Sequence, residues 1–263
     1  MKQQFDEEPQ AVVVTRGMTA CYTALNFDVR QTPDGRYEAE SVVVTTRDPL
    51  SKDDYPAIVT AIIRSRYSAD EMEAVSNNYM SNVSDMVAAA AFTEMQRWRG
   101  KAKEVAREVV LGLFGAGDEG RTDAVRELVA QRISNYDISD NVDAFFVNGV
   151  KYWMPKTMRE SLVMTLGEFQ KAGIAGFPFV LGGKTATLPC EVVSAMVTEV
   201  EVYATQCMAV TQQHLNAVAA ISDEQYLLEY DYTQGYPLMP PFQIPFDEGK
   251  TGKDFLSLSL YET

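Results

Sequence analysis

The chain has 263 residues, of which 46% are hydrophobic, so it is long enough for one large domain or two ordinary ones. Its formal net charge of −14, with no offsetting cluster of Lys or Arg, argues against binding to nucleic-acid backbones. No apolar run approaches the length of about 18 residues that a membrane span needs, and the acidic start MKQQFDEEPQ has no signal-peptide core. We therefore expect a protein that is made and kept in a cytoplasm.

The first part of the chain is predicted to form a β-hairpin. Alternation from Cys21 to Val29 places Cys, Thr, Leu, Phe and Val on one face. The Pro-Asp-Gly sequence at residues 33–35 then predicts a turn, because Pro fixes φ and Gly accepts the left-handed conformation. The segment YEAESVVVTT returns as the second strand, and AVVVTR at residues 11–16 is a candidate third strand.

Three helices are predicted to follow the hairpin. The first carries an apolar stripe of isoleucine and valine from Ile58 to Ile63. The second begins at a capping box, in which Ser68 and Glu71 bond to each other's backbone N–H groups. The third is a long amphipathic helix over residues 84–114, which ends because glycines cannot hold a helix. Its apolar stripe consists of Phe92, Met95, Trp98, Ala102, Val105, Val109 and Leu113.

The glycine cluster from Gly115 to Gly120 predicts a domain boundary, and a shorter helix at residues 122–136 bridges to the second half. The cluster contains G-x-G-x-x-G, but it closes a helix instead of following a strand, so we reject dinucleotide binding. The LGGK sequence at residues 181–184 lacks the spacer of a phosphate-binding loop and is interpreted as a hairpin turn.

The second half is predicted to contain two hairpins and two longer helices. Asn148 with Gly149 is a strong hairpin signal, and Gly182 with Gly183 marks the other turn. One helix runs over residues 155–172, and one of about thirty residues follows Pro189. The stripe of the longer helix is Val192, Met196, Val200, Tyr203, Cys207, Val210, His214 and Val218, and a last short helix is expected to be capped by Ser222 and Gln225.

Candidate catalytic and metal-binding groups are few. Cys21, Cys190 and Cys207 are odd in number and widely spaced, so we expect three buried thiols, and His214 alone does not predict a zinc site. Cys207 and His214 share a helix face, but seven residues rise about 10 Å, which excludes a direct dyad in an unbroken helix. We expect His214 to be a half-buried core residue bonded to a carbonyl or a tyrosine hydroxyl. None of the carboxylate pairs is placed for general acid–base catalysis, so we expect no catalytic residue, metal or cofactor.

Tyrosines are dense near the end of the last helix, in YDYTQGYP. One reading is core packing in which the hydroxyls find partners, and the other is an interface, where tyrosine is enriched. In either case we expect Tyr230, Tyr232 and Tyr236 to fold back on the long helix near His214 and to turn the chain into an arm.

Several spaced signatures in the second half resemble a domain of unknown function from bacteriophages and prophages. They are FFVNGVKYWMPKTMRESL, the LGGKTATLP hairpin, VYATQCMAVTQQHLNAVAAIS and YLLEYDYTQGYP, which together span residues 145–237. That family occurs in tail-fibre and tail-fibre-assembly proteins and brings no known catalytic residues. The resemblance implies a structural or assembly role in a phage.

The sequence as a whole predicts an α+β fold with three parts: residues 1–115, residues 116–237 and an extended arm at residues 238–263. We expect a virion protein, tail- or fibre-associated, made in the bacterial host cytoplasm and working through contacts with other phage structural proteins or with copies of itself. An assembly chaperone that leaves before maturation is the alternative, and an enzyme acting on host glycans is the least favoured class. The expected interface residues are Tyr230, Tyr232, Tyr236, Phe242, Ile244, Phe246, Phe255, Leu258 and Leu260.

Overall fold

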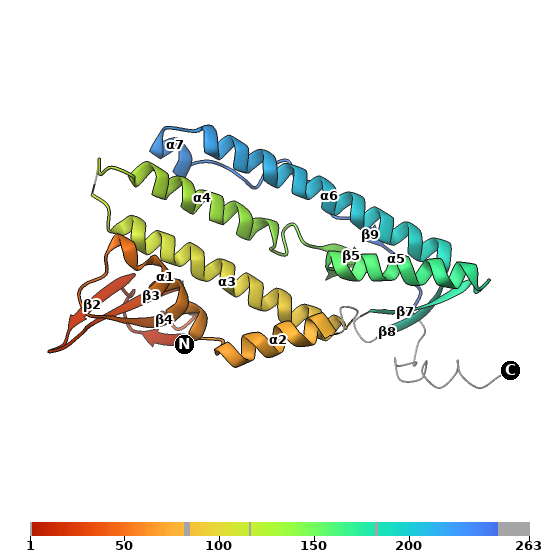
Figure 1. Ribbon diagram of the computed structural model, residues 1–263, viewed down its shortest axis with the longest axis horizontal. Helices are drawn as coiled ribbons and strands as arrows, with labels where there is room; N and C mark the ends of the chain where they lie inside the picture. The colour runs from red at the N-terminus through yellow and green to blue at the C-terminus, as the bar shows by residue number, and fades with distance from the viewer. Residues whose placement is uncertain (1, 82–84, 116, 182–183, 247–263) are drawn as a thin grey trace. The chain divides into compact units, whose positions relative to one another are not determined.

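The computed structural model describes residues 2–81, 85–115, 117–181 and 184–246 (Figure 1). Over these residues the chain is α+β, as predicted, with helices alternating with small sheets. It divides into two compact units, each assembled from separate stretches of sequence. Unit 1 consists of Met1–Ser81, Ala90–Tyr136 and Gln213–Tyr232, and unit 2 consists of Asn82–Ala89, Asp137–Gln212 and Thr233–Thr263.

Unit 1 contains a four-stranded antiparallel sheet. The predicted hairpin and its third strand are confirmed, and Lys2–Phe5 adds a fourth strand that the sequence analysis missed, because KQQF has no apolar alternation. The strand order is β1-β4-β3-β2, so β1 and β2 are the edges. The strands are β1 (Lys2–Phe5), β2 (Val12–Arg16), β3 (Cys21–Gln31) and β4 (Tyr37–Thr46).

One face of this sheet packs on α1 (Tyr55–Arg64) and α3 (Met86–Gly112) to form a core (Figure 1). The predicted face of β3 is buried up to Phe27, where a register shift begins and Asp28 adopts a φ of 53°. Trp98 joins the layers, since its indole Nε1 donates to the Ile62 carbonyl at 3.1 Å. The buried side chains of this core include Leu25, Phe27, Val42, Val44, Ile58, Ile62, Trp98, Ala102 and Val105.

The helix signals of unit 1 are largely confirmed. The short η1 turn (Lys52–Asp54) precedes α1, and α2 (Ala69–Ser81) follows it. The capping box of α2 forms as predicted: the Ser68 amide donates to Glu71 Oε2 at 2.7 Å and the Glu71 amide donates to Ser68 Oγ at 3.2 Å. The stripe of α3 is buried from Met95 to Val109, whereas Leu113, just beyond the end of the helix, is 37% exposed.

The glycine cluster connects two helices that belong to the same unit. Beyond it, α4 (Arg121–Asp137) packs with the last residues of α6 (Cys190–Ala220) and with α7 (Glu224–Leu228) around Val125, Ile133 and Leu227. The Asn135 side chain also reaches back to the Gly100 carbonyl of α3 at 3.3 Å. Unit 1 therefore includes residues from both sides of Gly115–Gly120. The predicted domain boundary at this point stays a prediction, which limited proteolysis can test.

Unit 2 contains two small sheets and two helices. The predicted Asn-Gly hairpin is confirmed: Asn148 and Gly149 have φ values of 49° and 80°, which only a turn of the primed type requires together. The strands are β5 (Phe145–Val147) and β6 (Val150–Tyr152), joined by parallel β9 (Pro241–Phe242), and separately β7 (Gly176–Leu181) with β8 (Lys184–Pro189). The helix α5 (Lys156–Lys171) lies between the two hairpins in sequence, and α6 follows β8.

Two details of the predicted helices were wrong. Val192 is 42% exposed, and Val193 and Val197 are buried in its place. Successive residues are about 100° apart around a helix, so a stripe drawn through Val192 starts at the margin of the buried face. At α7 the N-cap is Asp223 instead of Ser222, because Asp223 has the extended backbone and its Oδ1 accepts from the Tyr226 amide.

The three cysteines are free and buried, as expected. None of the helices within the described ranges combines the length and the apolar character that crossing a membrane requires.

Candidate functional site

Among the described strands, none pairs with the outer side of the edge strand β2, so part of its backbone has no strand partner. The Asn26 amide donates to the Ala11 carbonyl at 2.8 Å, so residues 11 and 26 form a hydrogen-bonded pair. Hydrogen-bonded and non-bonded pairs alternate along an antiparallel ladder. Val13 and Thr15 therefore bond to β3, while the N–H and C=O groups of Val12, Val14 and Arg16 turn to the open edge of the sheet.

An apolar groove lies beside this edge. Val12 is paired with Leu25 and Val14 with Thr23, and directly paired residues have side chains on the same face, so both valines are on the side of the sheet that packs on the helices. They nevertheless remain 37% and 48% exposed. The groove has a volume of about 420 Å³ and lies at the Val12 end of the edge, while Val14 is outside its lining. Its lining is mostly apolar, with Val12, Leu25, Phe27, Val105, Val109 and Leu113, and also includes the polar residues Asn26 and Glu108.

The turn after β2 forms a second, more polar hollow of about 300 Å³. Arg16 and Arg47 both line it, and within the described residues neither arginine forms an ion pair. Met18 stands fully exposed at the same turn. The end of β2 thus carries positive charge on a chain whose net charge is strongly negative.

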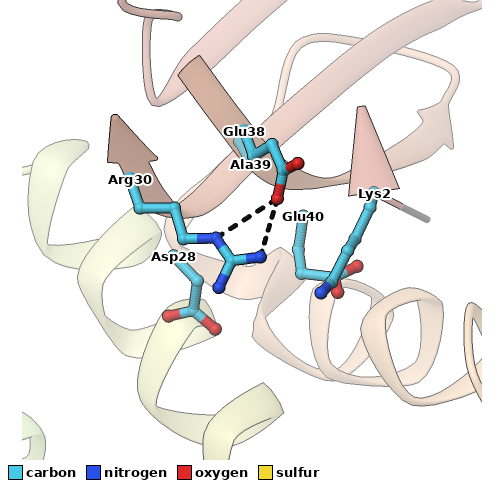
Figure 2. Close-up of a pocket in the computed structure, with 6 residues that line it drawn as sticks. All are labelled: Lys2, Asp28, Arg30, Glu38, Ala39 and Glu40. Carbon is cyan, nitrogen blue, oxygen red and sulfur yellow. Dashed lines mark hydrogen bonds and ion pairs between the residues drawn. The ribbon is translucent and has the colours of Figure 1, made fainter. Parts of the chain in front are cut away.

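The charged hollow at the other end of the sheet, about 200 Å³, is built from ion pairs. Figure 2 shows Arg30 between Asp28 and Glu38, with Lys2 beside Glu40 on the neighbouring strand. Arg30 Nε and Nη2 both donate to Glu38 Oε2, at 3.2 and 2.7 Å. These bonds, followed by one from Gln4, hold the pKa of Glu38 below its usual value.

This charged hollow does not have the properties of an acid–base site. A carboxyl group that acts as a general acid near neutral pH needs a raised pKa, and that of Glu38 is lowered. Asp28 is paired with Lys101 at 2.9 Å. Burial lowers the pKa of Lys101, but the bond from Asp28 and the charge of Glu104 outweigh it and raise the pKa overall. The cluster is a solvated network of ion pairs.

Tyr230 and Tyr236 fold back on the long helix α6, as expected, whereas the ring of Tyr232 contacts α4. The Tyr230 hydroxyl lies 2.8 Å from Nδ1 of His214, which confirms the half-buried histidine bonded to a tyrosine. Tyr232 packs edge-on against Tyr136, with ring centroids 5.7 Å apart. The Tyr236 hydroxyl lies 2.9 Å from Thr211 Oγ1, which in turn donates to Asp137.

The beginning of the predicted arm is covered by its own unit. Phe242 and Ile244 are 9% and 4% exposed, so a neighbouring subunit does not reach them without displacing this packing. Asn148 holds the segment, because its Nδ2 donates to the Ile244 carbonyl and its Oδ1 accepts from the Ile244 amide, each at 2.8 Å. Phe246 is half-buried. Phe255, Leu258 and Leu260 lie outside the described residues.

Asn148 is the residue that sequence reasoning missed. It was predicted only as a turn residue, yet its side chain bonds to Ile244, 96 positions later in the chain. Its backbone N–H also donates to the Phe242 carbonyl at 2.9 Å. Asn accepts the positive φ of a primed turn and also carries a donor and an acceptor. No periodic signal reveals such a long-range pairing.

Arg159 belongs to the segment that carries the phage resemblance, and its buried side chain connects α5 to α6. It is 5% exposed and bonds to Glu201 of α6 and to the Met154 carbonyl, and its guanidinium lies 5.2 Å from the Trp153 ring centre. A buried arginine is tolerated only when its donors are satisfied, and these partners provide that. Its placement gives Arg159 a structural role.

In the described ranges, the thiol and histidine groups that nucleophilic or metal chemistry would use are not gathered into one cluster. Burial raises the pKa of the Cys207 thiol, which keeps it protonated and weakly nucleophilic. Within the part of the chain that the structure describes, no cluster of three His, Cys, Asp or Glu side chains is arranged to hold a metal ion.

Comparison of the chain with protein-family models, with curated proteins and with solved structures found no match.

Proposed function

We propose that the protein is a structural component of a bacteriophage particle, associated with the tail or a tail fibre, and that it acts through protein–protein contacts. The observation that carries the contact role is the open edge of β2 with the apolar groove beside it. Folded proteins normally cover or charge such an edge, because it is a template for pairing with another chain. An edge that no other described strand covers, and that ends at Arg16 beside Arg47 and Asp48, suits a surface that meets a partner.

The phage context rests on the resemblance of residues 145–237. The residues that carry this resemblance have structural roles in the chain: the Asn-Gly hairpin holds the segment of Phe242, Arg159 clamps α5 to α6, and Tyr236 bonds to Thr211. Side chains that are engaged in such contacts within the fold favour a building block over a catalyst.

Mass spectrometry of purified particles tests the proposal. The sample is the phage whose genome encodes this chain, with its major capsid protein as an internal standard and an abundant host protein as the contamination control. We expect this chain at a fixed ratio to the capsid protein, retained after washing in high salt. A chain present in lysates but depleted from particles together with the host protein would contradict the proposal and support the assembly chaperone.

A further inference from the structure

We propose that the outer face of the four-stranded sheet, which is the face turned away from α1 and α3, packs on the same face of a second copy of this chain. The two copies are related by a two-fold axis that lies between the sheets and runs across the strands. The inference rests on the proposed function and deepens it, because it names a second copy as one partner in the contacts made there. The outer face is a different surface from the open edge of β2.

The outer face carries no charged side chain on any of the four described strands. Leu25, Val42 and Val44 belong to the core formed with α1 and α3, so the residues that alternate with them in the ladder point outward. The solvated face of an antiparallel sheet is normally polar, and this chain has many acidic residues to place there. The outward-facing residues are Gln3 and Phe5 of β1, Val13 and Thr15 of β2, Tyr22, Ala24 and Asn26 of β3, and Tyr37, Ala39, Ser41, Val43 and Thr45 of β4.

One end of this face is open and the other end is covered. Because β1 and β2 are at opposite edges of the sheet, residues 6–11 cross the sheet between them. They cross the outer face, since the Gln10 carbonyl accepts a hydrogen bond from the outward-facing side chain of Asn26 at 2.8 Å. Asn26 is accordingly 7% exposed, whereas Tyr22 and Val43 are 44% and 55% exposed. The face therefore has a raised end, formed by the crossing segment, and an open end.

The two ends of the face carry opposite charges. The crossing segment has three consecutive acidic residues at positions 6–8, all of them exposed, so the raised end is acidic. Arg16 and Arg47 line the hollow at the other end of the strands, together with Asp48. Exposed basic side chains therefore border the open end.

A second copy matches both the shape and the charge of this face. A two-fold axis across the strands reverses one sheet over the other, so the raised end of each copy meets the open end of its partner. The acidic residues 6–8 of each copy then approach Arg16 and Arg47 of the other, and the uncharged side chains meet between them. Sheets packed in this way lie within about 30° of alignment, as in β-sandwiches. A two-fold axis along the strands would place like charges together, which interfaces avoid.

This isologous contact is too small to hold free copies together. A standard interface uses about 20–30 residues a side, which exceeds the open end of the face and the crossing segment combined. The net charge of −14 also opposes the association of free copies. The contact therefore forms between copies that are concentrated or already gathered in an assembly. The open end consists of Val13, Thr15, Tyr22, Ala24, Val43 and Thr45.

Photo-cross-linking of the full chain tests whether the outer faces meet. A benzophenone side chain replaces Val43, and heavy-isotope-labelled copies are mixed with unlabelled copies and concentrated, so that mass spectrometry recognises cross-links between copies. The matched control carries the same group at Val150, which is 52% exposed on β6 of unit 2. We expect Val43 to cross-link to residues 13–24 or 41–45 of another copy, and Val150 not to reach them. Cross-links from Val43 to other surfaces, or none between copies, would overturn the inference.

Charge reversal tests the direction of the two-fold axis. One variant carries Arg16→Glu and Arg47→Glu. The other variant carries Asp6→Lys, Glu7→Lys and Glu8→Lys. In each variant alone like charges face each other, so we expect the Val43 cross-link between copies to fall about tenfold, and we expect a mixture of the two variants to regain it. Recovery in the mixture also shows that both variants are folded, whereas no loss in either variant, or a loss that mixing leaves in place, would refute the proposed pairing.

The cross-links and the particle analysis give separate answers. A chain found in particles that forms no Val43 cross-link between copies refutes this inference alone. A chain that cross-links as expected but is absent from particles refutes the proposed function alone.

Discussion

At the scale of single residues, the contact between His214 and Tyr230 explains why a helix end carries so many tyrosines. The hydroxyl of Tyr230 is 2.8 Å from Nδ1 of His214, and the two rings meet edge to face with centroids 5.7 Å apart. Each ring covers part of the other, and the Tyr230 hydroxyl and Nδ1 of His214 share a hydrogen bond. The histidine is thereby engaged in packing the segment after α7 against α6 within unit 1.

We expect His214 and Tyr230 to be coupled in their effect on folding stability, and we expect no catalytic or metal-binding role for His214. We expect His214→Phe and Tyr230→Phe each to lower the free energy of unfolding, and the double variant to lose less than the sum. The coupling should be about 0.5–1.5 kcal/mol, as for a typical net hydrogen bond. Urea denaturation of the four proteins measures it. Additive losses would contradict the pairing, and a metal bound at His214 by elemental analysis would contradict the packing role.

Tyr232 predicts a dependence of stability on alkaline pH. Burial, which outweighs the charge of Arg132, raises the pKa of its phenol above the ordinary value. Between the ordinary value of about 10 and the raised one the folded state holds more protons than the unfolded state, so stability falls as pH rises through this window. Tyr232→Phe should therefore lose less stability between pH 9 and pH 11 than the wild type, with the exposed Tyr226→Phe as control. Equal losses in wild type and Tyr232→Phe would show that Tyr232 does not contribute.

At the scale of elements, the Asn-Gly hairpin does two things, because it turns the chain and also holds β9. Gly149 has a φ of 80° with open space where a Cβ would lie, so a side chain there is strained by backbone conformation and not by a clash. Gly167, in the middle of α5, is also surrounded by open space but has no positive φ. Gly149 and Gly167 therefore differ in backbone conformation but not in the space around them, so each serves as the control for the other.

Gly149→Ala and Gly167→Ala should change stability in opposite directions. We expect the first to destabilise unit 2 by about 1–2 kcal/mol, the cost of a left-handed conformation for a residue with a Cβ. The second should stabilise it by about 0.5–1 kcal/mol, because alanine restricts the unfolded chain and suits a helix. Thermal unfolding followed by circular dichroism compares them. Stabilisation by Gly149→Ala would mean that the turn is not of the primed type.

The sequence could predict those elements whose signals are local. Alternation marked β3, the capping box marked α2, and the Asn-Gly pair marked the hairpin, since each signal acts within a few residues. Pairings between distant segments could not be predicted in this way. Lys2 lies opposite Glu40, and Asn148 bonds to a residue 96 positions later, and nothing in a periodic pattern records either.

The candidate site was missed for the same reason. The strand at residues 11–16 was predicted, but its place at the edge of the sheet depends on the order of all four strands. Exposure of Val12 on the helix side depends in turn on where α3 ends, near Gly112, which lines the same groove. Tyr230 and Tyr236 have hydrogen-bond partners within their own chain, as the core-packing reading expected, and their place at an interface stays a prediction.

At the scale of the whole molecule, the glycine cluster is where a protease should cut first. The described residues of Gly115–Gly120 are exposed, whereas the neighbouring helices are hydrogen-bonded. Because α4 and α7 belong to the same unit as the N-terminal sheet, the two fragments should stay together under native conditions. Limited proteolysis followed by size-exclusion chromatography and a denaturing gel checks both points. First cuts within residues 190–218, or fragments that elute apart, would contradict this expectation.

We expect copies of this chain to assemble through residues beyond Phe246. A cut at Leu238 would also strip Phe242 and Ile244 from their sites in unit 2, so the sharper variant ends after Phe246 and keeps that packing. The most direct measurement is native mass spectrometry of the full chain and of this shortened chain at equal concentrations. We expect an oligomer for the full chain and a folded monomer for the shortened one, and an equal number of subunits in both would contradict assembly through these residues.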